Sequence, residues 1–315
     1  MNRLLLILAV PGLVVILAVV WFLVPRGPRS AEGILKEKGE LRMATILERS
    51  RVHGMITEDV QLTSTTGLEV RALVQSPGGT GTRHPAVLFV GGMRTGRTAI
   101  LHVPKDRYPM VWMGIDYPYQ APPSFPDVAS ILDALPDAEA GVEQTLSALC
   151  LALDYLESRP DVDPRRTILA GGSLGSFLAV ICGGLEPRFE VVVSLYGGGD
   201  ILKIVEANLP WSSSISRGVA SLALNPWLGP LDPSKFVADV SPRPFLMVNG
   251  SRDARIPREC VLDLYERAGE PKELIWLDTE HRIQDEEDLM SEATGVVLEW
   301  LDAQGFLAGA GNGRD

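Results

Sequence analysis

One pentapeptide has the residue types and the spacing that nucleophilic catalysis requires. Gly171-Gly172-Ser173-Leu174-Gly175 matches the pattern Gly-x-Ser-x-Gly, in which small neighbours let a strand turn sharply into a helix and expose the serine hydroxyl. The pattern alone is weak, so it needs the right context. Residues 168–170 are apolar and strand-like, and residues 176–181 are typical of a buried helix. The context favours Ser173 as a nucleophile over an incidental serine in a glycine-rich turn.

Such a serine needs a base, because its hydroxyl is a poor nucleophile until the proton is removed. The histidines of the chain are His53, His84, His102 and His281. For this pattern the order along the chain is serine, acid, histidine, which leaves His281 as the base. Because His281 follows the apolar stretch 274–277, we expect it at the carboxyl edge of the sheet, where catalytic groups gather in open α/β folds.

The carboxylate that orients this histidine should follow a strand between the serine and the histidine. Asp253 fits best, because it comes shortly after the apolar stretch 245–248. Asp278 and Glu280 are rivals, but they are so close to the histidine in sequence that reaching its ring from the correct side is awkward. Asp253 could also do no more than accept turn hydrogen bonds, as Asp often does in loops.

Acyl transfer also needs backbone donors for the oxyanion that develops during the reaction. One should be the N–H of Leu174, directly after the nucleophile, and the other should come from the glycine-rich loop 91–96. Either Gly92 or Met93 could supply the second donor, or this loop could be an ordinary tight turn. Residues 116–119 follow another strand candidate, where they could touch the substrate or form a rigid loop.

Alternating strand-like and helix-like stretches predict an α/β fold with a mostly parallel sheet covered by helices on both faces. The strand candidates are 85–90, 110–115, 167–170, 191–195, 245–248 and 274–277, and the helix candidates are 138–158, 175–185, 257–268 and 285–304. Residues 59–64 and 68–74 alternate in polarity around Thr66-Gly67 and predict an antiparallel hairpin. The stretch 199–241 breaks the alternation and indicates a small cap insertion over one end of the sheet.

The N-terminus carries an uninterrupted apolar run from Leu4 to Val24. As a helix this run would span roughly 30 Å, the thickness of the hydrocarbon core of a bilayer, and no Ala-x-Ala-like cleavage site is obvious. We therefore expect residues 1–24 to be an uncleaved membrane anchor whose partner is the lipid bilayer. A mixed-charge linker over 25–50, a globular domain over 51–308 and a flexible tail over 309–315 are expected to follow.

The residues that flank the apolar run bear on which side of the membrane the domain lies. Arginines lie on both sides of the apolar run, at Arg3 and at Arg26 and Arg29, so they compete under the positive-inside rule. We expect the domain to lie outside the cytoplasm. Free cysteines favour the opposite orientation, because oxidising compartments tend to pair thiols.

Composition excludes several classes of protein. The 315 residues include 29 Lys or Arg and 40 Asp or Glu, a net charge of −11, and such an acidic chain without long basic runs is not expected to bind nucleic acid. Cys150, Cys182 and Cys260 lie far apart beside apolar residues, without zinc-site spacing. We therefore expect buried free thiols and no metal site.

The region 57–306 resembles an α/β-hydrolase, and it is most similar to the dienelactone hydrolase, acyl-peptidase and bacterial esterase-like branches. The segments Asp161–Ser176 and Pro187–Gly198 carry much of this resemblance. The roles that the resemblance implies are Ser173 as nucleophile, Asp253 as acid and His281 as base, without a cofactor. Gly91 stands where the common oxyanion loop of this family has the histidine of a His-Gly pair.

These observations predict a membrane-tethered serine hydrolase that cleaves a small-molecule ester through an acyl-enzyme. Acyl-CoA thioesterase or acyl-peptide hydrolase-like activity is an alternative, because fold and triad do not choose between ester, thioester and amide. An alternative of another class is a non-catalytic binding module at the membrane. An ordered set of serine, acid and histidine argues against it, because binding has no chemical need for all three.

Overall fold

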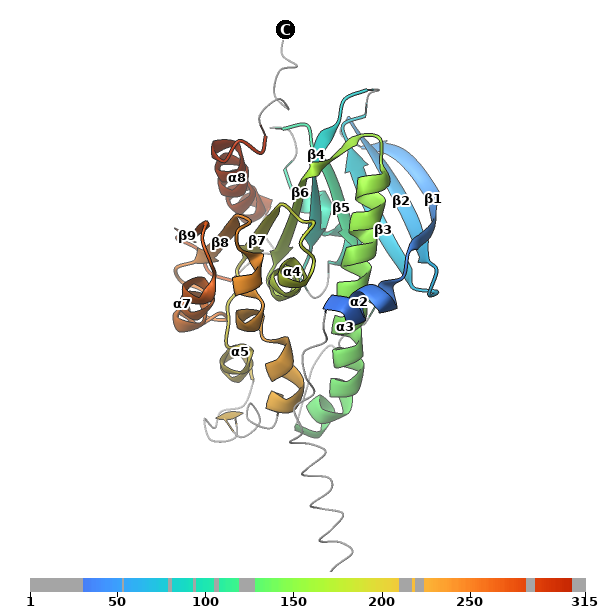
Figure 1. Cartoon of the computed structure of the whole chain (residues 1–315). Helices are drawn as coiled ribbons and strands as arrows, with labels where there is room; N and C mark the ends of the chain where they lie inside the picture. Colours follow the sequence, from blue (N-terminus) through green and yellow to red (C-terminus); the bar gives the residue numbers. More distant parts are fainter. Residues whose placement is uncertain are drawn as a thin grey trace, which may run out of the picture.

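The computed structural model describes residues 31–52, 54–78, 81–92, 95–104, 108–118, 128–209, 217–218, 224–281 and 287–307 (Figure 1). Three expectations lie outside these residues: the apolar run 4–24, the tail 309–315 and the position of Met93. None of the helices described combines the length and the apolar character that crossing a bilayer requires.

A single sheet of nine strands forms the centre of the described part of the chain. The strands are β1 (Leu41–Val52), β2 (Met55–Ser64), β3 (Glu69–Ser76), β4 (His84–Val90), β5 (Val111–Ile115), β6 (Val162–Gly172), β7 (Val191–Leu195), β8 (Phe245–Gly250) and β9 (Lys272–Leu277). Their order in the sheet is β1-β2-β3-β5-β4-β6-β7-β8-β9. The strands β1, β2, β3 and β5 pair antiparallel, and the pairs from β5 to β9 are parallel, which confirms the mostly parallel sheet.

The burial of each strand explains its sequence pattern. Every residue of β4, β5, β7 and β8 is buried, because helices cover both faces, and such strands carry continuous apolar runs. In contrast, β2 alternates between buried and half-buried residues, as expected of a strand with one face on the core. The hairpin of β2 and β3 joins at Thr66-Gly67, with Leu62 opposite Val70.

Helices lie on both faces of the sheet (Figure 1). The helices α3 (Val128–Ser158), α4 (Leu174–Leu185) and α7 (Arg258–Arg267) cover one face. The 3₁₀ helix η1 (Gly96–His102) and α8 (Glu287–Ala303) cover the other face. The helix α3 begins ten residues before the predicted start at Ala138 and contains Pro136, a residue that ordinarily ends or kinks a helix.

The prediction of a linker over residues 25–50 is wrong for residues 31–50, the part of this stretch that the structure describes. Residues Ala31–Lys38 form helix α2, and residues Leu41–Val52 form β1, which pairs antiparallel with β2. Ile34 of α2 is only 2% exposed and belongs to the main core. The sequence pattern missed β1 because almost all of this outermost strand is exposed, so burial imposes no apolar alternation on it.

The expected cap insertion over 199–241 divides into two parts. Its end packs into the core, because Val237 and Val240 of η4 (Val237–Val240) are buried with residues of α4 and α7. The preceding elements are α5 (Ile201–Asn208), a helical turn over 224–228, η2 (Gly229–Leu231) and η3 (Pro233–Lys235). Residues 233–240 therefore belong to the body of the domain, and a cap stays a prediction for the residues before them.

Candidate active site

Ser173 lies at the sharp turn between β6 and α4. Its backbone has φ 54° and ψ −117°, a conformation that costs energy for a residue other than glycine and is characteristic of functional sites. Glycines make the turn possible: a Cβ on Gly171 would collide with the carbonyl of Gly175, and a Cβ on Gly175 would collide with the carbonyl of Val90. The backbone N–H of Ser173 donates to the carbonyl of Leu195 on β7 at 2.9 Å, which holds the turn against the sheet.

His281 joins the serine to an aspartate. Its Nε2 lies 2.9 Å from Ser173 Oγ, and its Nδ1 lies 2.6 Å from Asp253 Oδ2. The side chains of His281 and Asp253 are only 9% and 2% exposed, so little water competes for these bonds. When Nδ1–H donates to the carboxylate, the lone pair of Nε2 faces the serine hydroxyl.

The loop after β8 fixes the aspartate. Asp253 Oδ1 accepts hydrogen bonds from the backbone N–H groups of Arg255 and Ile256 at 2.8 and 3.0 Å, while Oδ2 contacts the histidine. Asp253 therefore does both things considered from the sequence: it closes a turn and it reaches the ring. The rival Asp278 is 85% exposed and pairs with Arg252.

Tyr196 and Thr279 support the histidine, and sequence reasoning did not single them out. The ring of Tyr196 meets the His281 ring edge to face, with centroids 5.8 Å apart and an interplanar angle of 84°. Its hydroxyl lies 2.9 Å from Thr279 Oγ1, two residues before the histidine. Like Ser173, Tyr196 has a positive φ, of 53°. The available signal was a tyrosine followed by three glycines at a strand end.

The expected oxyanion loop leaves β4 next to the turn that carries Ser173. The hydroxyl of Tyr117 donates to the carbonyl of Gly91, and the N–H of Thr95 donates to the carbonyl of Gly92 at 3.2 Å. Leu174 is the first residue of α4, and the first N–H groups of a helix have no partner within it. Asp116 also pairs with Arg97, so Tyr117 and Asp116 support the loop at both of its ends.

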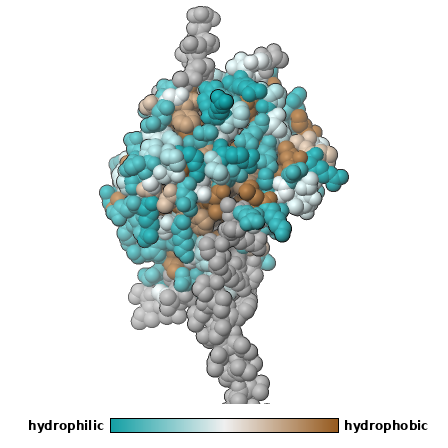
Figure 2. Space-filling view, in the orientation of Figure 1, coloured by the Kyte–Doolittle hydropathy of each residue, from teal (hydrophilic) through white to brown (hydrophobic). Residues whose placement is uncertain are grey.

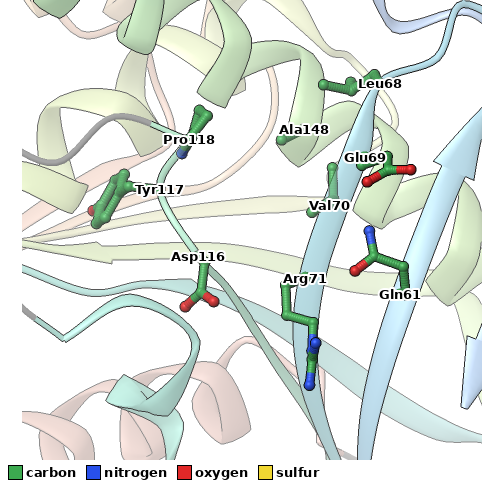
Figure 3. Close-up of a pocket in the computed structure, with 9 residues that line it drawn as sticks. All are labelled: Gln61, Leu68, Glu69, Val70, Arg71, Asp116, Tyr117, Pro118 and Ala148. Atoms are coloured by element: carbon green, nitrogen blue, oxygen red, sulfur yellow. The ribbon is translucent and has the colours of Figure 1, made fainter. Parts of the chain in front are cut away.

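A cavity of about 260 Å³ lies on the other side of this support (Figure 3). Its lining residues are Gln61, Leu68, Glu69, Val70, Arg71, Asp116, Tyr117, Pro118 and Ala148. Arg71 already holds Asp59 with two hydrogen bonds, so its charge is not free for a ligand. Ser173, Asp253 and His281 are not part of the lining. Among the residues described, no group of three His, Cys, Asp or Glu side chains could hold a metal ion.

Fold and site together define the class of this protein. In this mostly parallel sheet a strained serine follows the interior strand β6 and leads directly into a helix. This is the arrangement of the α/β-hydrolase fold, and the protein is a hydrolase. The model of the prolyl oligopeptidase family, peptidase family S9, matches residues 142–304. This match covers just over half of the chain and includes all three residues of the Ser–His–Asp arrangement, so the chain belongs to the prolyl oligopeptidase family.

Known proteins similar to this chain include esterases. The uncharacterized protein YfhR of Escherichia coli O157:H7 is 31% identical over 137 residues, which are 41% of this chain and 43% of that protein. This chain thus matches less than half of that relative. The acetyl xylan esterase from Paenibacillus sp. R4 has a TM-score of 0.64 and 17% sequence identity. The match covers 87% of this chain and 92% of that esterase. Acetyl xylan esterase 1 from Thermoanaerobacterium sp. JW/SL YS485 has a TM-score of 0.63 and 17% sequence identity. The match covers 90% of this chain and 95% of that protein. At such identities the two structures show the shared fold alone.

Proposed function

We propose that this hydrolase cleaves a carboxylic ester through an acyl-enzyme, with Ser173 as nucleophile, His281 as general base and Asp253 as the group that orients the histidine. The observation that carries the proposal is the continuous chain of contacts from Ser173 Oγ through both ring nitrogens of His281 to the buried Asp253. A structural serine at a turn has no need of such a chain, whereas nucleophilic catalysis does.

The proposed reaction has two halves. In the first half, Nε2 of His281 takes the proton of the Ser173 hydroxyl while Oγ attacks the ester carbonyl, and the protonated ring then gives this proton to the departing alcohol. In the second half, the histidine takes a proton from water, the resulting hydroxide attacks the acyl-enzyme, and Ser173 Oγ leaves with that proton as the acid is released. Asp253 stays ionised and stabilises the imidazolium that forms.

The oxyanion formed in both halves needs two donors. Leu174 N–H, at the start of α4, is the proposed first donor, and the N–H of Gly92 or Met93 is the second. The hydrogen bond from Tyr117 to the Gly91 carbonyl supports this assignment. In a trans peptide the C=O and the following N–H point in opposite directions, so fixing the Gly91 carbonyl also fixes the direction of Gly92 N–H.

The first experiment measures hydrolysis of p-nitrophenyl acetate, butyrate and octanoate, together with labelling by a fluorophosphonate. We expect Ser173→Ala and His281→Ala to lower kcat/KM by at least about 10⁴-fold and Ser173→Ala to abolish labelling. The matched controls are Ser251→Ala and His102→Ala, which change exposed residues and should keep wild-type activity. Wild-type protein that neither hydrolyses these esters nor takes up the probe would favour a non-catalytic binding module.

Amide cleavage is a second candidate, and membership in a peptidase family favours it. The same triad cleaves both bonds, so substrate preference decides between the two activities. Aminoacyl p-nitroanilides should be compared with the corresponding p-nitrophenyl esters and with an acyl-CoA thioester. A kcat/KM that is higher on the anilide than on the ester would replace the esterase proposal by a peptidase proposal, and the same result on the thioester would replace it by a thioesterase proposal.

We further propose that residues 4–24 tether the enzyme to a bilayer, with the domain outside the cytoplasm. The length of the uninterrupted apolar run supports the tether. Full-length protein should stay with membranes during alkaline carbonate extraction, and protease added to right-side-out vesicles should cleave the domain. Release by carbonate would reject the tether, and protection from protease would place the domain on the cytoplasmic side.

A further inference from the structure

Exposed large apolar side chains concentrate in one short part of the described chain. They are Leu35, Met43, Ile46, Leu47 and Leu101, with exposures between 42 and 55%. Four of these five lie on α2 and β1. Single exposed apolar residues are ordinary in soluble proteins, whereas a concentration of them marks an interaction surface.

The strand β1 is placed to contact a partner. It is the outermost strand of the sheet and lies beside β2 only, so its other edge faces away from the described part of the domain (Figure 1). Figure 2 shows apolar side chains among polar ones at the right-hand side of the molecule, where β1 lies. Met43 and Ile46 point to opposite faces of the sheet, because they pair in regular register with Thr63 and Val60 of β2. We therefore call the free edge of β1, with the side chains that flank it on both faces, the β1 surface; these are Met43, Ile46, Leu47, Arg42 and Arg51.

The charge of this region differs from that of the rest of the chain. Residues 25–52 contain seven Lys or Arg and four Asp or Glu, so basic residues are in excess there. The whole chain has 29 Lys or Arg and 40 Asp or Glu, so acidic residues are in excess overall. The strand β1 itself carries three basic residues, Arg42, Arg49 and Arg51, and one acidic residue, Glu48. Arg49 pairs with Glu58 of β2, while Arg42 and Arg51 are exposed. A basic and apolar strip on an otherwise acidic protein is complementary to anionic lipid headgroups.

Pairing of β1 with a second copy is disfavoured by the strand itself. Its pairing with β2 shifts register between Leu41 and Met43 and again between Ile46 and Glu48. Such irregularities, together with charged side chains, are features by which edge strands avoid edge-to-edge pairing. Two copies would also bring their arginines together.

We infer that the β1 surface rests on an anionic lipid bilayer, with Met43, Ile46 and Leu47 among the headgroups and Arg42 and Arg51 at lipid phosphates. The inference builds on the proposed tether, because the apolar run ends at Val24 and β1 begins only a short chain length later, at Leu41. The domain would then lie with this edge against the membrane instead of moving freely at the end of a spacer.

The test uses the full-length chain reconstituted in vesicles of phosphatidylcholine with about a quarter phosphatidylglycerol, with brominated acyl chains as quenchers. An environment-sensitive fluorophore is attached to Met43→Cys or Leu47→Cys. The native cysteines are buried, so the added thiol is labelled first. Ala303→Cys is the matched control, because it is exposed at the end of α8 on the opposite half of the sheet.

We expect brominated lipid to lower the fluorescence at positions 43 and 47 at least about twofold and to leave position 303 unchanged. Adding Arg42→Gln and Arg51→Gln should reduce the quenching in anionic vesicles. Absence of quenching at both positions in vesicle-bound protein would reject the inference while the tether stands, whereas protein that does not remain with vesicles would reject the tether. A disulfide between two copies of Leu47→Cys would assign the surface to a second copy.

Discussion

At the scale of single residues, backbone strain and side-chain support meet at the candidate site. Ser173 and Tyr196 both have φ near 50° and follow the adjacent strands β6 and β7. Such conformations persist only where surrounding contacts enforce them. For Tyr196 these contacts include the ring of His281 and the hydroxyl of Thr279, so we expect this tyrosine to position the histidine.

Tyr196→Phe keeps the ring and removes the hydrogen bond to Thr279. We expect kcat on p-nitrophenyl esters to fall about 10-fold, equivalent to about 1.4 kcal/mol, with little change in KM, because the histidine loses orientation but the binding surface stays. Thr279→Val, which removes the other half of the same bond, should give a similar loss. Tyr265→Phe on the remote helix α7 is the control, and an equal loss there would refute a specific role of Tyr196.

At the scale of elements, close packing shapes the turn that carries Ser173. The backbone of α4 approaches β4 so closely that Gly175 has no room for a side chain, because Val90 and Gly91 carbonyls occupy the space. The glycine is therefore required by tertiary packing as well as by the local turn. In α8, by contrast, a Cβ on Gly295 would meet nothing within 4 Å.

This contrast gives a matched pair of substitutions. Gly175→Ala should lower the free energy of unfolding by about 3 kcal/mol, because overpacking forces backbone shifts, and it should also reduce esterase activity. Gly295→Ala should raise the free energy of unfolding by up to about 1 kcal/mol, because alanine is the better helix former. Urea unfolding measures both. Equal effects at the two positions would show that the space around Gly175 is not as tight as described.

A second pair of substitutions tests whether α2 belongs to the domain. Ile34 is buried against the core, while the adjacent Leu35 is 42% exposed. Ile34→Ala should therefore lower the free energy of unfolding by about 3 kcal/mol, and Leu35→Ala should change it by less than about 0.5 kcal/mol. If Ile34→Ala proved as neutral as Leu35→Ala in urea unfolding, residues 31–38 would act as a spacer after all.

At the scale of the whole molecule, a charged cluster joins distant parts of the chain. Arg159, which follows α3, donates to Glu58 of β2 and to Asp161 just before β6. Burial by itself raises the pKa of Glu58, but Arg159 and Arg49 outweigh it and hold this pKa below its usual value. A lowered folded-state pKa means that the stabilisation is present above the ordinary pKa of Glu and is lost as the pH falls through the folded value.

The stability of the molecule should therefore respond to acid through this cluster. Glu58→Gln should lower the free energy of unfolding by about 2 kcal/mol at pH 7, and the difference from wild type should shrink as the pH falls below the ordinary pKa of Glu. Glu69→Gln changes an exposed position, so its free energy of unfolding should depend on pH as that of the wild type does. The measurement is urea unfolding between pH 7 and pH 3, and a difference that does not depend on pH would contradict a role of the Glu58 charge.

The sequence by itself determined the features that local pattern encodes. Continuous apolar runs identified the parallel strands, the glycine-flanked serine identified the turn, and chain order selected His281 among the histidines. The structure confirms that the three cysteine thiols are free and buried. These features depend on neighbours within a few residues, where the periods of helix and strand act.

Only the tertiary structure decided which groups meet. Ser173 and His281 are 108 residues apart in the chain, and His281 and Asp253 are 28 apart, so sheet order and loop direction determine whether Asp253 or Asp278 reaches the ring. The contact of Tyr196 with His281 and the strand β1 were equally hidden from local pattern. The physical reason is that these arrangements arise from packing between distant segments, which leaves no periodic mark on an exposed strand or on a single supporting side chain.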